Sequence, residues 1–481
     1  MQDKNAVPSY LASAKPNPTS NRAPWYKNTA PTYAGIFLWF VFWSYSLGSG
    51  TPGGMLSAGV WVALGSVLVA ALLCHVAFYY APALFGRRTG LPLYIVGAST
   101  FGAVGGFLLP GFLMGLLQFG WLAVNTFGSA NALNAMFEFG VKDGVLVNSM
   151  GLYVIMAIWG VAAVVTALKG IKYVGMLSTY LPLIPLAILL ILVAKTIGGV
   201  GSFDAAAFSA ADIVEGKAPM SAFMVFAFAL TYIVGFFATA GAAGVDFGTG
   251  SRNKKDVWMG GLVGVAGAIF FTIGAAILIV AGFYGSPAGK EMIAAGTVTL
   301  NPMDLMKLIF NENIAKWLFF ALALTAFPSA CFCSLIAANS IRNTLPKINP
   351  WLSCGVGCAV AIMLAIVLQV TGGADKCVVV FKFIGASFGP ICGAIAMEYI
   401  LCKGRWSGPR KGFNPAGWIS WAVGFVVGAQ PILVDQFGLK MAEIPAAPVA
   451  AFIVGAVVYA LLAKAQSAVL PYPQADEQSA D

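Results

Sequence analysis

Long apolar stretches alternate with short polar segments along almost the whole chain. Runs such as Met150–Thr166, Leu181–Val193 and Val257–Phe283 contain few charged residues, and a helix needs about 20 mainly apolar residues to cross a bilayer. The pattern predicts an all-α membrane protein with about 12 transmembrane helices. We place them at residues 33–50, 57–82, 102–134, 147–167, 174–194, 220–245, 257–283, 314–341, 351–371, 379–402, 414–431 and 446–463.

The polar ends differ from this pattern. Residues 1–29 and 466–481 are rich in Ser, Pro, Asn, Gln or Asp, a composition typical of disordered segments. Between them no polar block is large enough for a separate soluble domain. We therefore predict one transmembrane transporter domain over residues 30–465, with a disordered cytoplasmic tail at each end.

Charge supports this topology. Charged residues make up 9% of the chain and the net charge is +9, whereas a soluble domain carries about 25% charged residues. If the predicted spans alternate across the bilayer, 18 of the 27 basic residues, including every arginine, lie on the side of the termini. The positive-inside rule then places both termini in the cytoplasm. We expect a multi-pass protein of the plasma (cell inner) membrane whose partner is the lipid bilayer and not nucleic acid.

Two predicted spans contain small polar residues flanked by aromatic ones. The segments are 42–50 in the first span and 234–241 in the sixth, five spans apart. Many transporters contain two inverted repeats whose first helices are broken in mid-membrane at the substrate site. The alternative is that these glycines only permit close helix packing.

The third span carries polar and aromatic residues on one face. Gln118, Trp121 and Asn125 are spaced i, i+3 and i+7, so they share a helix face. A buried amide needs a hydrogen-bond partner, and a flat heterocycle that stacks on Trp121 would supply one. Hydrogen bonds between helices would satisfy the amides equally well.

Four segments resemble the nucleobase–cation symporter-1 family, which includes the cytosine permeases and transporters of hydantoins and allantoin. They are Gln118–Trp121 in the third span, Gly241–Lys254 after the sixth, Gly389–Tyr399 in the tenth and Phe413–Trp418 before the eleventh. The resemblance implies the leucine-transporter fold, with two inverted five-helix repeats and two further C-terminal helices. It also implies cation-coupled import of nucleobases, hydantoins, allantoin or related vitamins.

The resemblance implies a substrate site formed by seven residues: Trp43, Gln118, Trp121, Phe236, Phe237, Cys333 and Ser334. Trp121 and Phe237 would stack on the ligand, Gln118 would bind its edge, and Trp43 would close one side. Phe236 stands where cytosine permeases have a serine, which removes a hydroxyl and adds bulk.

The resemblance also implies a cation site, and the chain departs from the family there. Main-chain oxygens of Trp39 and Phe42 would be ligands, but the family's Ser/Thr pair on the eighth helix is not intact, and Thr325 and Ser329 are the nearby hydroxyls. We expect no resident cofactor, and either sodium or a proton as the coupling ion.

Three charged residues near span ends are candidate gating residues. Lys382 either extends to the outer membrane interface or contacts an acidic ligand or an outer gate. Asp246 and Glu398 lie near the cytoplasmic ends of the sixth and tenth spans, where Arg252 or Arg405 would pair with them in an inner gate. The alternative for both carboxylates is a plain interfacial charge.

These features favour secondary active import of a planar small-molecule substrate by alternating access. The alternative on the same fold is an uncoupled facilitator, or a carrier of another solute such as an amino acid or acidic metabolite. The sequence argues against an enzyme, because it contains one histidine, no phosphate-binding loop and no recognisable set of catalytic residues.

Overall fold

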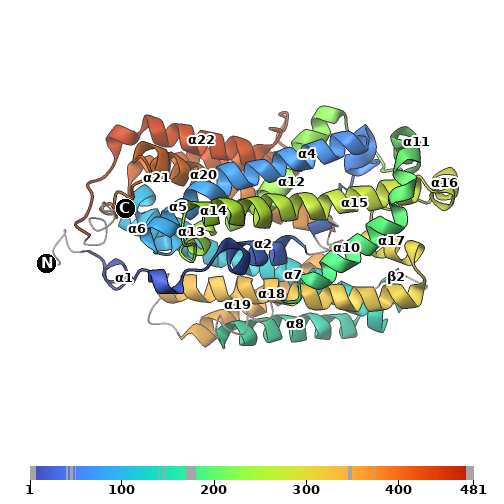
Figure 1. Cartoon of the computed structure of the whole chain (residues 1–481), viewed down its shortest axis with the longest axis horizontal. Coiled ribbons are helices and arrows are strands. Elements are labelled where there is room, and N and C mark those ends of the chain that lie inside the picture. The colour runs from blue at the N-terminus through green and yellow to red at the C-terminus, as the bar shows by residue number, and fades with distance from the viewer. Residues whose placement is uncertain are drawn as a thin grey trace.

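The computed structural model describes residues 7–38, 42–43, 47–48, 50–139, 141–142, 145–146, 148–169, 180–344, 349–372 and 374–472. Its long helices run side by side along one axis (Figure 1). Within this part of the chain, ten helices are long and apolar enough to cross a membrane, and Ala447–Leu461 is a shorter apolar helix. The all-α membrane fold predicted from the sequence is confirmed.

The helices of the first half are α1 (Ser9–Ala12), α2 (Thr29–Phe37), α4 (Val60–Leu73), α5 (Tyr80–Thr89), α6 (Leu93–Gly106), α7 (Met114–Phe137), α8 (Met150–Leu168), α10 (Leu183–Thr196), α11 (Ala205–Ala211), α12 (Ala222–Ala242) and α13 (Gly244–Gly248). Those of the second half are α14 (Lys254–Gly261), α15 (Ala268–Tyr284), α16 (Pro287–Ala294), α17 (Pro302–Ile309), α18 (Glu312–Thr344), α19 (Pro350–Val370), α20 (Ala374–Leu401), α21 (Pro415–Phe437) and α22 (Ala447–Leu461).

Shorter elements complete the fold. The π-helical turns Cys74–Tyr79, Phe107–Leu113 and Leu262–Gly267 join α4 to α5, α6 to α7 and α14 to α15. The 3-10 turns are Thr19–Asn21, Trp25–Lys27, Gly54–Ala58, Ile197–Ser202 and Ala463–Ala465. Strands β1 (Val141–Lys142) and β2 (Val145–Leu146) form a small antiparallel pair.

Several helices begin where the sequence supplies a capping side chain. The Ser221 hydroxyl accepts the Met224 N–H at the start of α12, and the Asn253 side chain accepts the Asp256 N–H at the start of α14. Such caps satisfy backbone donors that have no partner inside the helix. Apolar composition and capping together determine these helix starts.

The long third span bends at Gly102. This residue has φ 85° inside α6, and a Cβ there would lie 2.3 Å from the Gly412 carbonyl oxygen. The Ala103 N–H donates to the Arg410 carbonyl at 2.7 Å, and the Asn414 N–H donates to the Phe101 carbonyl at 2.9 Å. The bend therefore arises where the loop before α21 inserts its backbone into the helix.

The predicted interruption at 234–241 is wrong. Helix α12 is continuous to Ala242, and the break follows at Ala243, before α13. A Cβ on Gly86 would lie 1.8 Å from the Val245 carbonyl oxygen, and one on Gly248 would lie 2.1 Å from the Ala83 carbonyl oxygen. These two glycines permit backbone contact between α5 and α13. Within the predicted segment, a Cβ on Gly241 would lie 3.0 Å from the Phe78 Cβ and one on Gly235 would lie 3.1 Å from the Phe381 carbonyl oxygen, which fits the alternative of close helix packing.

The first span departs from a regular helix as expected. Helix α2 ends at Phe37, and Gly48 has φ 78°. The rest of the predicted break at 42–50 lies partly outside the described residues.

The described segments nearest the two termini pack against one end of the bundle, where α1, α6 and α13 also lie (Figure 1). The Tyr10 hydroxyl donates to the Ala103 carbonyl oxygen, and the Asn17 side chain donates to the Thr249 carbonyl at 3.0 Å. The Tyr472 hydroxyl donates to the Leu11 carbonyl at 3.2 Å. The described parts of the two predicted tails therefore lie on the transporter body.

Candidate functional site

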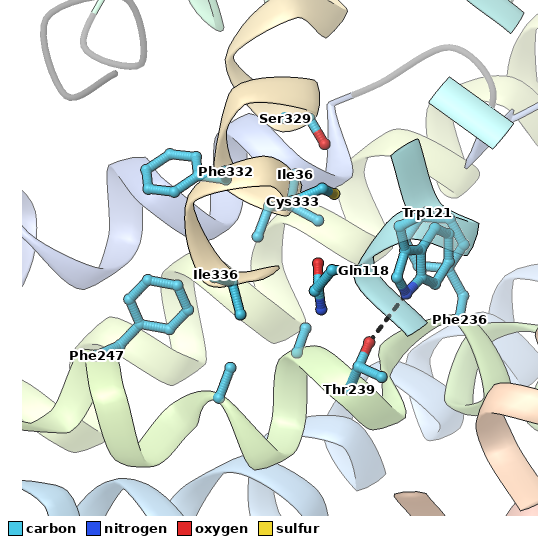
Figure 2. Close-up of a pocket in the computed structure, with 12 residues that line it drawn as sticks. Ile36, Gln118, Trp121, Phe236, Thr239, Phe247, Ser329, Phe332, Cys333 and Ile336 are labelled. Atoms are coloured by element: carbon cyan, nitrogen blue, oxygen red, sulfur yellow. Dashed lines mark hydrogen bonds between the residues drawn. The ribbon is translucent and has the colours of Figure 1, made fainter. Parts of the chain in front are cut away.

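A small pocket lies between α2, α7, α12, α13 and α18 (Figure 2). Its volume is about 60 Å³, and its lining is mostly apolar: Ile36, Gln118, Trp121, Phe236, Thr239, Ala240, Ala243, Phe247, Ser329, Phe332, Cys333 and Ile336. Gln118, Trp121, Thr239 and Ser329 carry the polar groups of this central pocket.

Trp121 forms an aromatic wall of the central pocket. Its indole N–H donates to the Thr239 hydroxyl at 3.1 Å (Figure 2). The ring centroid lies 4.5 Å from that of Phe236, edge to face, and 5.1 Å from that of Phe381, stacked. One indole orientation is thus fixed by a hydrogen bond and two rings.

Gln118 points into the central pocket beside Trp121 and Thr239 (Figure 2). Its side-chain N–H donates to the Met114 sulfur at 3.3 Å. A thioether is a weak acceptor, so a ligand oxygen or ring nitrogen would replace this contact at little cost. The Gln118 amide is therefore available to form hydrogen bonds with the edge of a heterocycle.

Asn125, on the same predicted face, is satisfied by neighbouring helices. Its side-chain N–H donates to the Ala326 carbonyl at 3.0 Å, and its side-chain oxygen accepts the Trp159 indole N–H at 3.0 Å. Hydrogen bonds between helices therefore satisfy the Asn125 amide, and it needs no ligand as a hydrogen-bond partner.

The central pocket brings together four of the predicted substrate residues: Gln118, Trp121, Phe236 and Cys333. The other three lie elsewhere. Phe237 is fully buried against Tyr33 and Phe37. The Ser334 hydroxyl donates to the Ala330 carbonyl, and Trp43 lines a separate cavity of about 10 Å³.

Sequence reasoning missed Thr239 and Phe381. Thr239 follows Phe236 by three residues, so helical spacing alone puts it on the pocket face. Phe381 immediately precedes Lys382 on α20, and only the folded arrangement brings its ring against Trp121.

The structure describes three of the four predicted cation residues: Phe42, Thr325 and Ser329. Trp39 lies outside the described residues. The Phe42 ring packs 4.4 Å from Phe236, the Thr325 hydroxyl donates to the Leu322 carbonyl at 2.7 Å, and Ser329 lines the central pocket. Thr325 and Ser329 are one turn apart on α18.

A second, larger cavity lies next to the central pocket, toward the end of the bundle that holds the termini. Its volume is about 360 Å³. Four residues line both cavities: Ala243, Phe247, Phe332 and Ile336. The two spaces therefore share a wall, and we call the second one the inner cavity.

Asp246 on α13 faces the inner cavity. One carboxylate oxygen accepts the Leu93 N–H at 3.0 Å. The protein around it raises the pKa of this carboxyl to about 6, although the Leu93 N–H acts to lower it and the residue is exposed to the cavity. Arg252, one predicted partner of Asp246, pairs instead with Asp256 at 2.8 Å.

Glu398 lies in a buried polar network. Its carboxylate accepts the Ser407 hydroxyl at 2.7 Å and the Tyr459 hydroxyl at 2.6 Å. An Arg410 nitrogen lies 3.6 Å away, whereas Arg405 was the predicted cation. The network links α20, α22 and the loop before α21.

Lys382 pairs with acidic residues near the other end of α20. Its ammonium lies 2.5 Å from an Asp435 oxygen on α21 and 3.9 Å from a Glu443 oxygen. Lys382 and Glu398 are 16 positions apart on α20, which corresponds to about 24 Å of helix. The two charged groups therefore lie toward opposite ends of the bundle.

A family model for permeases of cytosine/purines, uracil, thiamine and allantoin matches residues 16–442. The chain belongs to this family. It is a membrane permease and not an enzyme, and the resemblance to the nucleobase–cation symporter-1 family is confirmed.

Characterised permeases are distant in sequence. The allantoin permease of Bacillus subtilis (strain 168) is 22% identical over 385 residues, which cover 74% of this chain and 72% of that protein. The cytosine permease of Escherichia coli (strain K12) is 23% identical over 326 residues, covering 67% and 66%.

Solved structures share the fold. The nucleobase-cation-symport-1 transporter Mhp1, closed with bromovinylhydantoin bound, has a TM-score of 0.64 at 16% identity, covering 96% of this chain and 98% of that one. A Na⁺-coupled sialic acid symporter has a TM-score of 0.57 at 12% identity, covering 98% and 95%. These matches confirm the leucine-transporter-type fold of the permease.

Proposed function

We propose that the permease imports a planar nucleobase-like heterocycle by alternating access across the plasma membrane. A purine, pyrimidine, hydantoin, allantoin or related vitamin fits this class. The observation that carries the proposal is the central pocket, where a single amide, Gln118, stands beside an oriented indole, Trp121, among apolar side chains.

The proposed binding mode uses both groups together. The ligand ring packs against Trp121 and the apolar wall, while Gln118 exchanges hydrogen bonds with the ligand edge. Aromatic contact contributes about 0.5–1.5 kcal/mol beyond the burial of apolar area. The edge contact adds selectivity, because a ligand without matching groups leaves the buried amide poorly satisfied.

The size of the central pocket supports a cycle with at least two states. Ligand pockets usually have volumes of about 300–1,000 Å³, and the central pocket has about 60 Å³. A heterocycle therefore needs the pocket to widen. Stacking of Phe381 on Trp121 closes one wall, and movement of α20 would enlarge the space.

The transport is proposed to be coupled to sodium or to protons. The hydroxyls of Thr325 and Ser329 support a sodium site on α18, although the Thr325 hydroxyl donates to a carbonyl of its own helix. Asp246 supports proton coupling, because its raised pKa of about 6 lies close to physiological pH. The Ser/Thr pair that the family has on its eighth helix is incomplete on α18, and this also favours the alternative, an uncoupled facilitator.

Lys382 is proposed as a gating residue at the outer end. Its ion pair with Asp435 joins α20 to α21. The preceding residue, Phe381, carries the ring that stacks on Trp121. Lys382→Met is expected to change the rate and substrate preference of uptake while the protein still folds. Unchanged uptake, pH profile and preference would end this proposal. Asp246 and Glu398 are the proposed gating residues at the inner end of the bundle.

The test is a ligand panel on the purified protein, followed by uptake into proteoliposomes. Nucleobases, hydantoins, allantoin, thiamine and amino acids are added with and without sodium at two pH values. A heterocycle at about 100 times its Kd should stabilise the fold by about 2.7 kcal/mol. Accumulation driven by a sodium or proton gradient would support coupling, and equilibration without accumulation would support the facilitator. Stabilisation only by an amino acid or acidic metabolite would contradict the heterocycle proposal.

A further inference from the structure

The inner cavity has the size of a ligand site, whereas the central pocket does not. Its 360 Å³ falls in the usual range for small-molecule sites, and the 60 Å³ of the central pocket falls far below it. In this conformation a heterocycle leaving the central pocket would enter the inner cavity across the shared residues Phe247, Phe332 and Ile336 (Figure 2).

Asp246 lines the inner cavity and has unused bonding capacity, and Tyr94 is a second ionisable residue in the lining. Asp246 accepts the Leu93 N–H, but an ionised carboxylate offers about four acceptor positions. Among the ion pairs of the described residues, none involves Asp246. A donor on a bound solute would therefore find an acceptor that no neighbouring cation neutralises.

The apolar part of the inner cavity's lining suits a flat ring. Phe247 and Phe332 provide aromatic surface, and Leu335 and Ile336 provide aliphatic surface. An apolar wall with a few convergent polar groups is typical of sites for small aromatic solutes. The geometry thus combines a surface for ring packing with a hydrogen-bond acceptor at one edge.

We propose that the inner cavity is a second binding station on the transport path, at which Asp246 accepts a hydrogen bond from an exocyclic amino group of a planar heterocycle. This inference rests on the proposed function and refines its substrate class. An exocyclic carbonyl in the same place would bring its oxygen close to the Asp246 carboxylate, and because both groups are acceptors no hydrogen bond would form. The station therefore favours amino-bearing rings over their oxo analogues.

The protonation state of Asp246 is compatible with this role. Its pKa of about 6 leaves the carboxylate ionised at pH 7.5, the pH at which the test is made. Hydrogen bonds to charged groups contribute more than neutral ones, about 1.5–3 kcal/mol in mutational series, which corresponds to about a tenfold or greater change in Kd.

The test compares two ligand pairs, cytosine with uracil and adenine with hypoxanthine, by binding to the purified full-length protein. Asp246→Asn should weaken binding of the amino-bearing member by about tenfold or more and leave the oxo member unchanged or tighter. Asp246→Glu should retain the wild-type preference. Asp304→Asn is the matched control, because Asp304 is an exposed carboxylate on α17 and lines neither cavity.

A second variant tests the cavity without changing the carboxylate. Leu335 lines the inner cavity and not the central pocket, so Leu335→Trp should fill the station and weaken binding of the amino-bearing ligand. This variant decides the question if Asp246→Asn does not fold. An unchanged amino-to-oxo ratio in Asp246→Asn, or unchanged cytosine and adenine binding in Leu335→Trp, would overturn the inference while transport of heterocycles stands. If the wild type binds no heterocycle at all, the proposed function itself has failed.

Discussion

At the scale of single residues, the central pocket depends on which face of each helix is turned inward. Phe236 lies on the pocket while the adjacent Phe237 packs away from it, because neighbouring residues in an α-helix point about 100° apart. The amide of Gln118 is held only by a sulfur. The pocket therefore contains one polar group that binding can recruit without breaking a strong internal bond.

Gln118→Ala is expected to weaken heterocycle binding by about tenfold or more, because the ligand edge loses its hydrogen-bond partner. The folded protein should keep its melting temperature, since the side chain makes only the weak contact with Met114. Binding is measured by isothermal titration. Asn131→Ala on the same helix is the control, because Asn131 bonds to Gln369 and lies outside the pocket. Normal binding by Gln118→Ala would show that the site is misplaced.

Asp246→Asn is expected to raise the melting temperature at pH 7.5 and to leave it almost unchanged near pH 4. The protein around Asp246 raises the pKa of its carboxyl from 3.8 to about 6, and because the residue is exposed to the cavity, solvent screening keeps the effect on stability small. The folded protein therefore binds this proton more tightly than the unfolded chain, and stability falls as pH rises through this interval. Asparagine does not ionise and avoids that loss.

The other ionisable groups near this carboxylate do not alter the expectation. Tyr33 and Tyr94 interact with Asp246 but are neutral tyrosines over this pH range, and Arg252 is paired with Asp256. Melting curves at pH 4, 6 and 7.5, with Asp304→Asn as control, measure the effect. An equal shift at all three pH values would contradict a raised pKa.

At the scale of helices, glycine decides how closely α5 and α13 approach. Ten of the twelve predicted spans correspond, among the described residues, to helices long and apolar enough to cross a membrane, because apolar length is a local property of the chain. The sequence did not predict where the sixth span breaks, because Gly241 and its neighbours serve packing as readily as unwinding. It also named Arg405 as a partner of Glu398, whereas Arg410 lies there, since the folding of a loop onto helices depends on contacts distant in the chain.

Gly86→Ala should destabilise the protein, because the added Cβ would lie 1.8 Å from the Val245 carbonyl oxygen and the two backbones would have to separate. Overpacking of this kind costs about 1–3 kcal/mol. Gly355→Ala on α19 is the matched control, since a Cβ there meets nothing within 4 Å and alanine favours helix over glycine by about 1 kcal/mol. Thermal unfolding in detergent should separate the two variants, and equal melting temperatures would contradict the close contact.

At the scale of the whole molecule, basic residues gather at the end of the bundle that holds both termini. An Arg22 nitrogen donates to the Arg87 carbonyl, an Arg88 nitrogen to the Gly404 carbonyl, and an Arg410 nitrogen to the Ser467 carbonyl. The charge asymmetry seen along the sequence thus corresponds to a physical end of the protein. The inner cavity lies toward the same end, so the orientation of the protein in the membrane also determines on which side Asp246 acts.

This orientation is expected to place both termini in the cytoplasm, because cytoplasmic segments retain basic residues during insertion. A green fluorescent protein fused to either terminus should fluoresce, since it matures in the cytoplasm and not after export through the general secretory route. Alkaline phosphatase fused after Gly216, in the connection between α11 and α12 at the other end, should be active only if that end faces outward. Fluorescence at the termini together with phosphatase activity at Gly216 would place Asp246 on the cytoplasmic side and Lys382 on the outer side. The reverse pattern would exchange the proposed inner and outer gates and turn the inner cavity into an entry station for import.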